Sequence, residues 1–386
     1  MTLLAKYNLK SLLRRKAATV STALSFALAV AVFVVLMGLA KGVLDVHHRA
    51  GNERNIVVLQ KGASDAHFSS LSSEDLHKIR YREFVARTVD GRESVSPELE
   101  LVSWVTLPQV AGKRHTNLRG VTAPAVDLHG IQLEQGRLFR GSSEAILGKT
   151  AAKRFGLRPG DKFTAEDQTY TVTGIFSCSG SVIESEVWCD LDGLMAVSGR
   201  MATTGKHSSM VIRVGDGYDP RRVCDELSTD KSVFVDAKPE KEYYRGMGNI
   251  FGQLEQLGLA TSLIACIGAM FSGMNTMYNS VARRTREIGV LRAIGFSRNV
   301  LLIMFIAESL AMGLVGGAIG LVAGHGLVSA ANQFGVSLLS VAFSLDVPSS
   351  VLVEGMLLSA LAGLLGGFLP ARRAARLEIV KAVRYI

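Results

Sequence analysis

The chain has 386 residues, of which 48% are hydrophobic and 20% are charged, and its formal net charge is +9. A chain can be this hydrophobic and also this charged only if its charged and its hydrophobic residues lie in different segments. The composition therefore excludes a protein that is soluble along its whole length. Four stretches are long enough to cross a hydrocarbon core about 30 Å thick, because a spanning helix needs roughly 20 apolar residues. They lack Asp, Lys and Arg and run over Ala17–Ala40, Leu257–Val281, Val300–Ala330 and Val351–Ala371.

The first stretch follows a basic segment, residues 1–16, so it has two interpretations: a cleaved secretory signal or a membrane helix. Its apolar run exceeds the roughly 7–15 residues that are usual for a signal. We therefore predict a first transmembrane helix over residues 17–40.

Residues 41–250 are too many for a loop and too polar for lipid, so they predict a mixed α/β domain inserted between the first and second membrane helices. Strands that alternate with helices predict two lobes, divided near residues 115 and 205. The predicted strands are Ile56–Leu59, Leu101–Leu107, Leu118–Val121, Thr169–Phe176, Glu186–Cys189, Val211–Val214 and Val233–Val235. The predicted helices start at the capping residues Ser72 and Asp219 or cover Lys149–Phe155 and Asp192–Gly199.

The segment Asp161–Phe176 is typical of a hairpin with its turn at Asp167-Gln168. After Pro239, the polar run Glu240–Glu255 contains no breaker except glycine. It therefore predicts a helical stalk that continues into the second membrane segment, 251–281.

Basic residues outside the inserted domain gather beside the membrane segments, whereas the domain itself holds 28 basic and 28 acidic residues and is neutral. The clusters are Lys6, Lys10, Arg14, Arg15 and Lys16; Arg283, Arg284, Arg286, Arg292 and Arg298; and Arg372, Arg373, Arg376, Lys381 and Arg384. Because cytoplasmic flanks retain Lys and Arg, both termini and the loop 282–299 are predicted to be cytoplasmic. The domain then lies on the far side of the membrane, together with the short loop 331–350 between the helices 300–330 and 351–371. This topology and anionic lipid account for the net charge, which argues against a nucleic-acid-binding protein.

Gly148-Lys149-Thr150 matches the end of a phosphate-binding loop, but the glycine that this loop needs five residues before Gly148 is Ser143. The sequence therefore predicts no ATPase site in this chain and gives no positive case for an enzyme. The histidines lack a cysteine or acidic cluster that would complete a metal site, so they are predicted to be solvated surface residues. Those considered are His47, His48, His67, His77, His115 and His129.

Three of the four cysteines, Cys178, Cys189 and Cys224, lie in the inserted domain, and an odd number excludes a complete disulfide framework. Two alternatives stay open: a bond between Cys178 and Cys189, or three unpaired thiols.

Glycines at four-residue spacing occur in the last two membrane segments: Gly316, Gly320 and Gly324 in the third, and Gly363 and Gly367 in the fourth. Small residues at this period let helix backbones approach closely. The pattern predicts tight helix packing, within one chain or between chains.

Glu308 lies about two turns inside the third membrane helix, where an ionised carboxylate is costly and is by default a functional candidate. The alternative is a carboxylate near the cytoplasmic interface that bonds to an arginine or to the backbone of a neighbouring helix. We favour the alternative, because Glu308 is only about 12 Å deep at 1.5 Å per residue.

The cytoplasmic loop at 282–298 reads ARRTREIGVLRAIGFSR and is the strongest local signal in the sequence. A helix over Arg283–Ala293 places Ile288, Leu291 and Ile294 on one face. A short amphipathic helix held by a membrane helix at each end predicts a rigid contact for a soluble partner. The alternative is a helix that lies in the lipid headgroups.

This loop resembles the cytoplasmic loop of the MacB/FtsX-type permeases of ABC transporters, in which R-T-R-E-I-G-V-L-R-A-I-G precedes a helix with an acidic residue and a glycine-rich second half. Residues Arg284–Gly295 match that form and are followed by Glu308 and by Gly313–Gly324. The tail over Leu369–Leu377 is also similar, although Ile379-Val380 stands where the family commonly has a proline. In the inserted domain, the segments similar to the DevC-like branch are Asn55–Gly62 and Glu184–Leu191.

The resemblance implies a permease subunit without its own ATPase site and without a directly bound cofactor, in a homodimer with separate ABC ATPase subunits that use ATP. It implies a bacterial inner-membrane location, contact with membrane lipid, and a periplasmic adaptor and outer-membrane channel as further partners. The implied function is export of a lipid or amphiphile, driven by motion of the periplasmic domain; the alternative is an FtsX-like mechanotransmitter that activates a periplasmic partner without transport. The implied ATPase-coupling residues are Arg284, Arg286, Glu287 and Arg292, with Ile288 and Leu291 packing the loop.

Overall fold

The structure is a computed structural model that describes residues 16–88, 90–108, 112–198, 206–334, 337–338, 341–342 and 347–377. The predictions for Lys6, Lys10, Arg14, Arg15, Lys381, Arg384 and Ile379-Val380 lie outside these residues. The described chain divides into two compact units. We call them the membrane unit, made of described residues within 1–42, 253–330 and 345–386, and the external domain, made of described residues within 43–252 and 331–344.

Within the described residues, four helices have the length and composition needed to cross a membrane. They are α2 (Lys16–His48), α8 (Glu240–Arg283), α10 (Arg298–Phe334) and α11 (Ser349–Ala375). The external domain is inserted between the first and second of them, which confirms the predicted fold class. Helix α2 extends past the predicted end at Ala40, and α8 begins at Glu240, the first residue of the predicted stalk.

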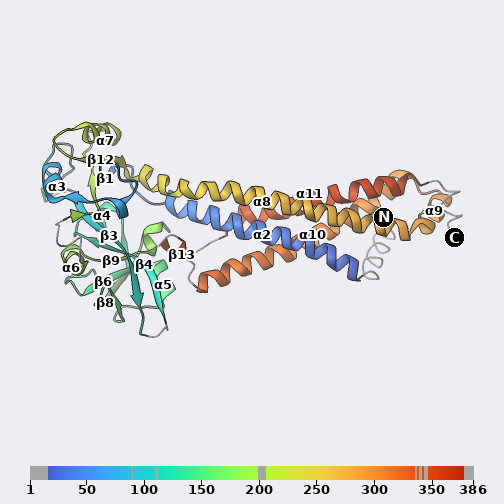
Figure 1. Cartoon of the computed structure of the whole chain (residues 1–386), viewed down its shortest axis with the longest axis horizontal. Helices are drawn as coiled ribbons and strands as arrows, with labels where there is room; N and C mark the ends of the chain where they lie inside the picture. The colour runs from blue at the N-terminus through green and yellow to red at the C-terminus, as the bar shows by residue number, and fades with distance from the viewer. Residues whose placement is uncertain are drawn as a thin grey trace. The chain divides into compact units, whose positions relative to one another are not determined.

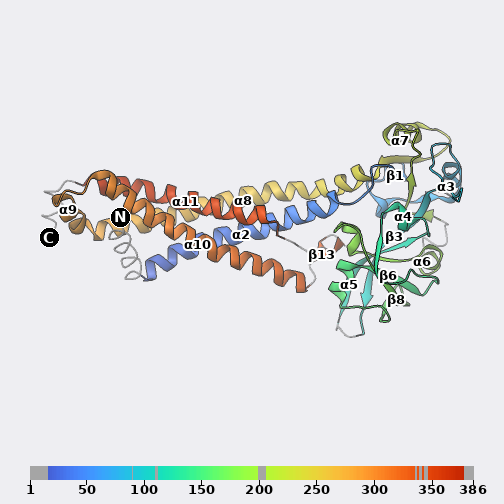
Figure 2. The same cartoon turned by 180° about the vertical axis from the view of Figure 1, so that it is seen from behind.

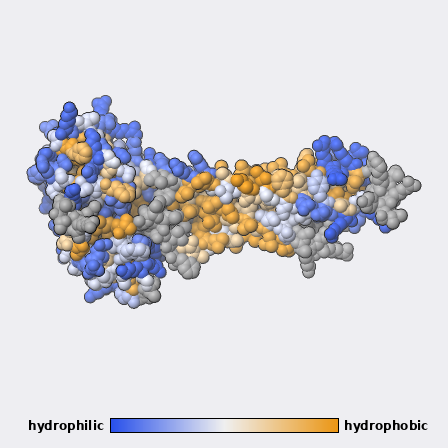
Figure 3. Space-filling view, viewed as in Figure 1, coloured by the Kyte–Doolittle hydropathy of each residue, from blue (hydrophilic) through white to orange (hydrophobic). Residues whose placement is uncertain are grey.

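Within the membrane unit these helices lie side by side, as Figures 1 and 2 show from opposite sides. Backbone approach at small residues brings them together, while large apolar side chains such as Leu257, Ile264 and Val322 are exposed. Apolar residues cover the surface of these four helices in the membrane unit (Figure 3). Hydrophilic residues gather at the end of the unit that carries α9 (Thr285–Ala293) (Figure 3). An apolar exterior of this kind suits a lipid environment.

The described part of the external domain is built on one ten-stranded sheet in the order β12-β1-β11-β3-β4-β9-β6-β8-β5, with β7 paired to β3 and β8. The pairs β4–β9 and β6–β8 are parallel, and the other pairs on this path are antiparallel. The strands of this sheet are β1 (Asn55–Gln60), β3 (Val95–Thr106), β4 (Lys113–Val121), β5 (Gln132–Gly136), β6 (Glu144–Gly148), β7 (Lys162–Ala165), β8 (Gln168–Ser177), β9 (Val187–Asp190), β11 (Ser209–Arg213) and β12 (Val235–Pro239).

The described part of the domain also contains short helices and two small strand pairs. The helices are η1 (Ala66–Phe68), α3 (Ser73–Arg80), α4 (Ala125–Leu128), α5 (Lys149–Phe155), η2 (Val182–Ser185), α6 (Leu191–Val197) and α7 (Pro220–Thr229). The strand pairs are β2 (Leu71–Ser72) with β10 (Lys206–His207), and β13 (Ser337–Leu338) with β14 (Val341–Ala342).

Two hydrophobic cores give the domain two lobes. One packs α3 and α7 against β1, β11 and β12, and the other packs α5 and α6 against β4, β6, β8 and β9. Strand β3 enters both, with Val95 in the first core and Leu99 in the second. The first division therefore lies near residue 97 rather than 115, because a single long strand passes from one lobe to the other.

Most local signals in the inserted domain correspond to real elements. Ser72 and Asp219 accept backbone hydrogen bonds as the N-caps of α3 and α7, as predicted. The hairpin of β7 and β8 turns at Glu166-Asp167, one residue earlier than predicted, and both turn residues have positive φ. The cysteines are unpaired, so the alternative with free thiols agrees with the structure.

Candidate functional site

The loop between α8 and α10 is a separate short helix. Arg284 leaves the helical conformation after α8 ends at Arg283, and α9 follows over Thr285–Ala293. After α9, Gly295 has a φ of 107°, a value that glycine adopts without strain, and the chain turns into α10. We call the segment 282–299 the coupling loop.

Apolar packing holds α9 against the ends of three membrane helices. Ile288 is fully buried and Leu291 is half-buried in a cluster contributed by α8, α10 and α11. The members from those helices are Met277, Val281, Leu301, Met304, Phe305, Met312, Ala371 and Ala374. The helix therefore has an anchored face, and it does not depend on lipid to bury Ile288.

Arg284 and Glu308 form a buried ion pair between the coupling loop and α10. The Nη1 atom of Arg284 lies 3.2 Å from Oε2 of Glu308, and the two side chains are 6% and 3% exposed. Arg284 therefore faces the helices and not solvent, and its place at or near the ATPase contact stays a prediction. Glu308 bonds to an arginine, which is the arrangement of the favoured interpretation from the sequence.

The opposite face of α9 is exposed and mixes charge with apolar surface. Arg286 is exposed, and the Glu287 side chain is 59% exposed. Val290 is 45% exposed, and Ile294, which was expected on the anchored face, is 73% exposed. Arg292 is half-buried. Such a face suits contact with a soluble protein.

The predicted packing glycines all lie at helix contacts inside the chain. A Cβ atom on Gly316, Gly320 or Gly324 would meet α2, at the backbone oxygens of Ala23, Ala27 and Ala31. Gly363 packs against Gly313 and Ser309 of α10, and Gly367 packs against Ser309. The Ser309 hydroxyl donates to the Gly363 carbonyl at 2.6 Å, and that of Ser359 donates to the Gly313 carbonyl at 2.7 Å.

In the external domain, Arg119 of β4 lies at the centre of a buried group of carboxylates. It donates two hydrogen bonds to Glu186, at 2.7 and 2.8 Å. Its Nη1 atom also lies 2.7 Å from Glu98 and 2.8 Å from Glu100 of β3. Strand register explains this arrangement, since Glu100 is directly opposite Arg119 and Glu98 is on the same face.

His129, at the end of α4, extends this group to the first residue of α8. Its Nε2 atom lies 2.9 Å from Glu98, and its Nδ1 atom lies 2.9 Å from Glu240. All three side chains are fully buried. Burial opposes the charged form of His129, but Glu98 and Glu240 outweigh it and raise its pKa to about 10. The solvated position predicted for His129 is therefore wrong, and His47 is buried as well.

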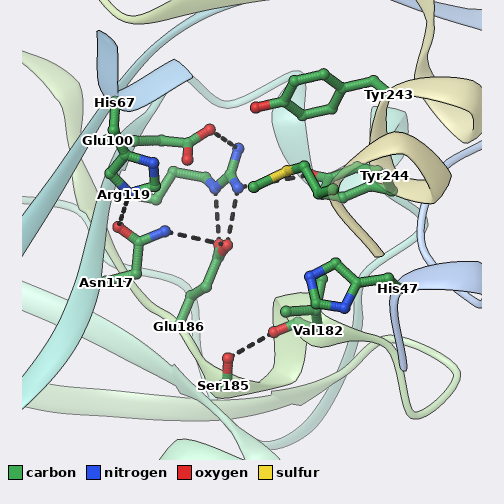
Figure 4. Close-up of a pocket in the computed structure, with 11 residues that line it drawn as sticks. His47, His67, Glu100, Asn117, Arg119, Val182, Ser185, Glu186, Tyr243 and Tyr244 are labelled. Atoms are coloured by element: carbon green, nitrogen blue, oxygen red, sulfur yellow. Dashed lines mark hydrogen bonds and ion pairs between the residues drawn. The ribbon is translucent and has the colours of Figure 1, made fainter. Parts of the chain in front are cut away.

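A small cavity of about 20 Å³ lies beside Arg119, between the sheet and the first turns of α8 (Figure 4). Arg119 points between Glu100 and Glu186, while Tyr243 and Tyr244 approach from α8 and His47 approaches from α2 (Figure 4). Burial raises the pKa of Glu100 despite the attraction of Arg119. The space suits one water molecule. Within the described residues, no group of three or more His, Cys, Asp or Glu side chains has the arrangement of a metal site.

Sequence patterns do not reveal this charge network, because its six members come from five separate segments of the chain. One signal was present: Glu98 and Glu100 alternate with Leu99 and Leu101, so a strand over these residues places both acids on one buried face. A basic residue on the neighbouring strand is then required to compensate them.

Comparison with known proteins gives two adjacent family matches. Residues 19–229 match the family described as the MacB-like periplasmic core domain. Residues 259–379 match the FtsX-like permease C-terminal family. The first match alone covers more than half of the chain.

Individual relatives are more distant. The macrolide export ATP-binding/permease protein MacB of Burkholderia pseudomallei is 28% identical over 286 residues, which cover 68% of this chain and 42% of that protein. This chain thus spans about two fifths of that relative's length. An uncharacterized ABC transporter permease of Methanocaldococcus jannaschii is 25% identical, with 66% of each chain covered.

The solved structure of the periplasmic region of MacB from Actinobacillus actinomycetemcomitans matches 54% of this chain and 98% of that one, at 15% identity and a TM-score of 0.40. The two family matches together extend over both units of the described chain. The chain therefore belongs to the family of MacB/FtsX-type permeases of ABC transporters.

Proposed function

We propose that this chain is a permease subunit that couples ATP hydrolysis by a separate ATPase to motion of its external domain, and thereby exports a lipid or another amphiphile. The observation that carries the proposal is the two-sided coupling loop. One face of α9 is fixed by Ile288 and by the Arg284–Glu308 pair, and the other offers Glu287, Val290 and Ile294 to solvent. A force applied to the exposed face is passed to α8, α10 and α11 through packed side chains.

The proposal includes an orientation and a set of partners. With the basic flanks in the cytoplasm, the coupling loop faces the ATPase and the external domain lies in the periplasm of a bacterial inner membrane. The chain works as a homodimer with ABC ATPase subunits, a periplasmic adaptor and an outer-membrane channel. It binds no cofactor itself, and ATP is used by the ATPase. Membership of the permease family supports these assignments.

Residues Arg286, Glu287 and Arg292 are proposed as the charged part of the ATPase contact. Because two of these side chains are positive and one is negative, they favour a partner surface that carries charges of both signs. Arg284 has another proposed role, in which it fixes the start of α9 to Glu308.

The proposed substrate class rests on the family. The name of the Burkholderia relative describes export of macrolides, which are amphiphilic molecules. Because four helices with an apolar exterior give direct access to lipid, an amphiphile taken from the membrane is the proposed cargo.

A mechanotransmitter that moves no substrate is the second candidate function. The observation that favours it is the buried charge network, which joins α8 directly to the sheet of the external domain. A strain that lacks the gene distinguishes the two functions. Loss of an exported amphiphile supports transport, whereas a normal exported-lipid profile together with a cell-wall defect supports mechanotransmission.

The coupling proposal is tested with the chain and a candidate ABC ATPase, copurified from membranes. Glu287→Lys is expected to lower permease-stimulated ATPase activity about tenfold, the effect of losing roughly 1.4 kcal/mol at an interface. The matched control is Arg372→Glu, an exposed charge reversal at the end of α11 that lies outside α9. Normal stimulation in Glu287→Lys, or the absence of any complex, contradicts the assignment.

A further inference from the structure

Helix α8 begins inside the external domain with a carboxylate that is completely buried. The Oε2 atom of Glu240 accepts hydrogen bonds from the backbone N–H of Asn52 and from Nδ2 of Asn55, both at 2.8 Å. A carboxylate at a helix N-terminus is also attracted by the helix dipole. The first residue of α8 is thus held by β1 and by the turn that precedes it.

The other oxygen of Glu240 faces His129, and the chain of charges continues into the sheet. His129 lies between Glu240 and Glu98, 2.9 Å from each, and Glu98 lies 2.7 Å from Arg119. Arg119 in turn holds Glu186, which accepts a hydrogen bond from the Trp188 indole at 2.8 Å. One continuous network therefore connects the start of α8 to β3, β4 and β9.

Close backbone contacts enclose the same end of α8. Gly51 has a φ of 83°, and a Cβ atom there would lie 3.0 Å from the backbone of Glu240 and Lys241. A Cβ atom on Gly248 would lie 3.2 Å from the Cβ atom of His47 on α2. The Tyr243 hydroxyl accepts the backbone N–H of Ala66 at 3.1 Å. One face of the first turns of α8 is thus packed against the domain, while Glu242 and Arg245 are exposed on the other face.

Buried ion pairs add little net stability compared with well-packed apolar residues, so their advantage is the geometry that they define. Here that geometry relates the end of one helix to three strands. Loosely held apolar side chains allow a helix to slide or rotate. Here the hydrogen bonds from Asn52 and Asn55 to Glu240, together with its ion pair to His129, fix both direction and register.

We propose that Glu240 and His129 are positioning residues that lock the first turn of α8 to the sheet of the external domain, so that the helix end and the sheet move as one body. The inference rests on the proposed function for its purpose, because such a joint passes motion of α8 to the domain without loss. The Glu240–His129 contact names the point at which motion of α8 reaches the sheet, a point that the coupling proposal does not specify.

The test measures the joint in the full-length chain reconstituted in lipid nanodiscs, without any ATPase. Spin labels are placed at Arg245→Cys on α8 and Lys153→Cys on α5, both exposed positions, and their distance distribution is recorded by pulsed electron paramagnetic resonance. The four native cysteines are buried, and the chain without introduced cysteines serves as the labelling blank. Circular dichroism shows that each variant is folded.

The locked joint gives a single narrow distance. Glu240→Gln and His129→Gln are each expected to widen the distribution about twofold or to add a second distance, because the helix end gains alternative positions. Since the two residues share one contact, the double variant is expected to widen the distribution by less than the sum of the two single changes. The matched control Glu242→Gln alters a 63% exposed carboxylate two residues away and leaves the distribution unchanged.

Narrow distributions in both folded variants, or strictly additive widening, overturn the proposal. If the variants do not fold, the unaltered chain carries the test, since raising the pH through about 10 removes the proton from His129. The charged and titratable groups around His129 are Glu98, Glu240, Arg119, Arg213 and Cys178. A distribution that stays narrow as His129 deprotonates also overturns it. None of these outcomes depends on an ATPase, so failure here is distinguishable from failure of the coupling proposal.

Discussion

The membrane unit and the external domain each bury an arginine against carboxylates, but the number of buried carboxylates differs: one in the membrane unit and three in the external domain. Arg284 pairs with Glu308 at the junction of the coupling loop and α10. Arg119 meets Glu98, Glu100 and Glu186, and the network continues through His129 to Glu240. The first site joins two adjacent segments, whereas the second joins strands and a helix from distant parts of the chain.

The two units also differ in where they place their large apolar side chains. In the external domain, large apolar side chains such as Trp188 and Phe163 are buried. In the membrane unit, Ile264 and Val322 are exposed, and glycines and serines fill the helix contacts. Packing without a hydrophobic driving force depends on close backbone approach. A buried charge pair therefore has different surroundings in each unit, and substitutions can compare them.

The largest effect is expected for Arg119→Met. The change leaves three buried carboxylates without their shared cation, and breaking such a group costs roughly 3–5 kcal/mol of unfolding free energy. The thermal unfolding of the purified chain, followed by circular dichroism, should show a lower midpoint. Arg137→Met, which removes a half-exposed partner of Glu144, is the control and should unfold like the unaltered protein. Equal midpoints for the two variants would contradict the central role of Arg119.

A smaller effect is expected at the coupling loop. Glu308→Leu leaves Arg284 buried beside apolar side chains, at a cost of about 3 kcal/mol. The double variant Arg284→Met/Glu308→Leu removes both charges and should recover much of the loss. Thermal unfolding in detergent checks both expectations. A double variant that is less stable than Glu308→Leu would show that the two residues do not act as a pair.

The helix contacts of the membrane unit give the third comparison. Gly320→Leu forces a side chain into a contact where a Cβ atom would already lie 2.5 Å from the Ala27 carbonyl oxygen. Overpacking of this kind costs about 1–3 kcal/mol. Gly326→Leu is the control, since no atom lies within 4 Å of its Cβ position. Thermal unfolding that is the same for both variants would argue against a contact between α2 and α10 at Gly320.

Local signals explain which parts could be predicted from the sequence. The length of an apolar run specifies a membrane helix by itself, and the N-caps Ser72 and Asp219 act on the turn that follows them, so α3 and α7 start where expected. Helix α5 even has the predicted bounds, Lys149–Phe155. These features depend on neighbours only a few residues away.

Long-range pairing explains the failures. His129 is buried because Glu98 and Glu240 compensate its charge, and those residues are 31 and 111 positions away in sequence. Arg284 is buried because Glu308 lies opposite it on another helix. Ile294 continues the helical conformation of α9, but at 3.6 residues per turn it lies roughly 120° around the helix from Ile288, so it does not share the anchored face. Pattern analysis does not detect such partners, since each is defined by tertiary structure.

The smallest effect concerns the pH dependence of the external network. His129 keeps its proton in the folded chain up to a pKa of about 10, whereas in the unfolded chain its pKa is near the usual value of about 6.5. Its contribution to stability is therefore complete below about pH 6.5 and falls as the pH rises towards 10, because the folded state then binds more protons than the unfolded state. Between pH 7 and 8 the unfolding free energy should decrease by at most about 1.4 kcal/mol from this group. His129→Gln should remove that part of the slope when unfolding is measured at both pH values, and an unchanged slope would show that His129 is not charged between Glu98 and Glu240.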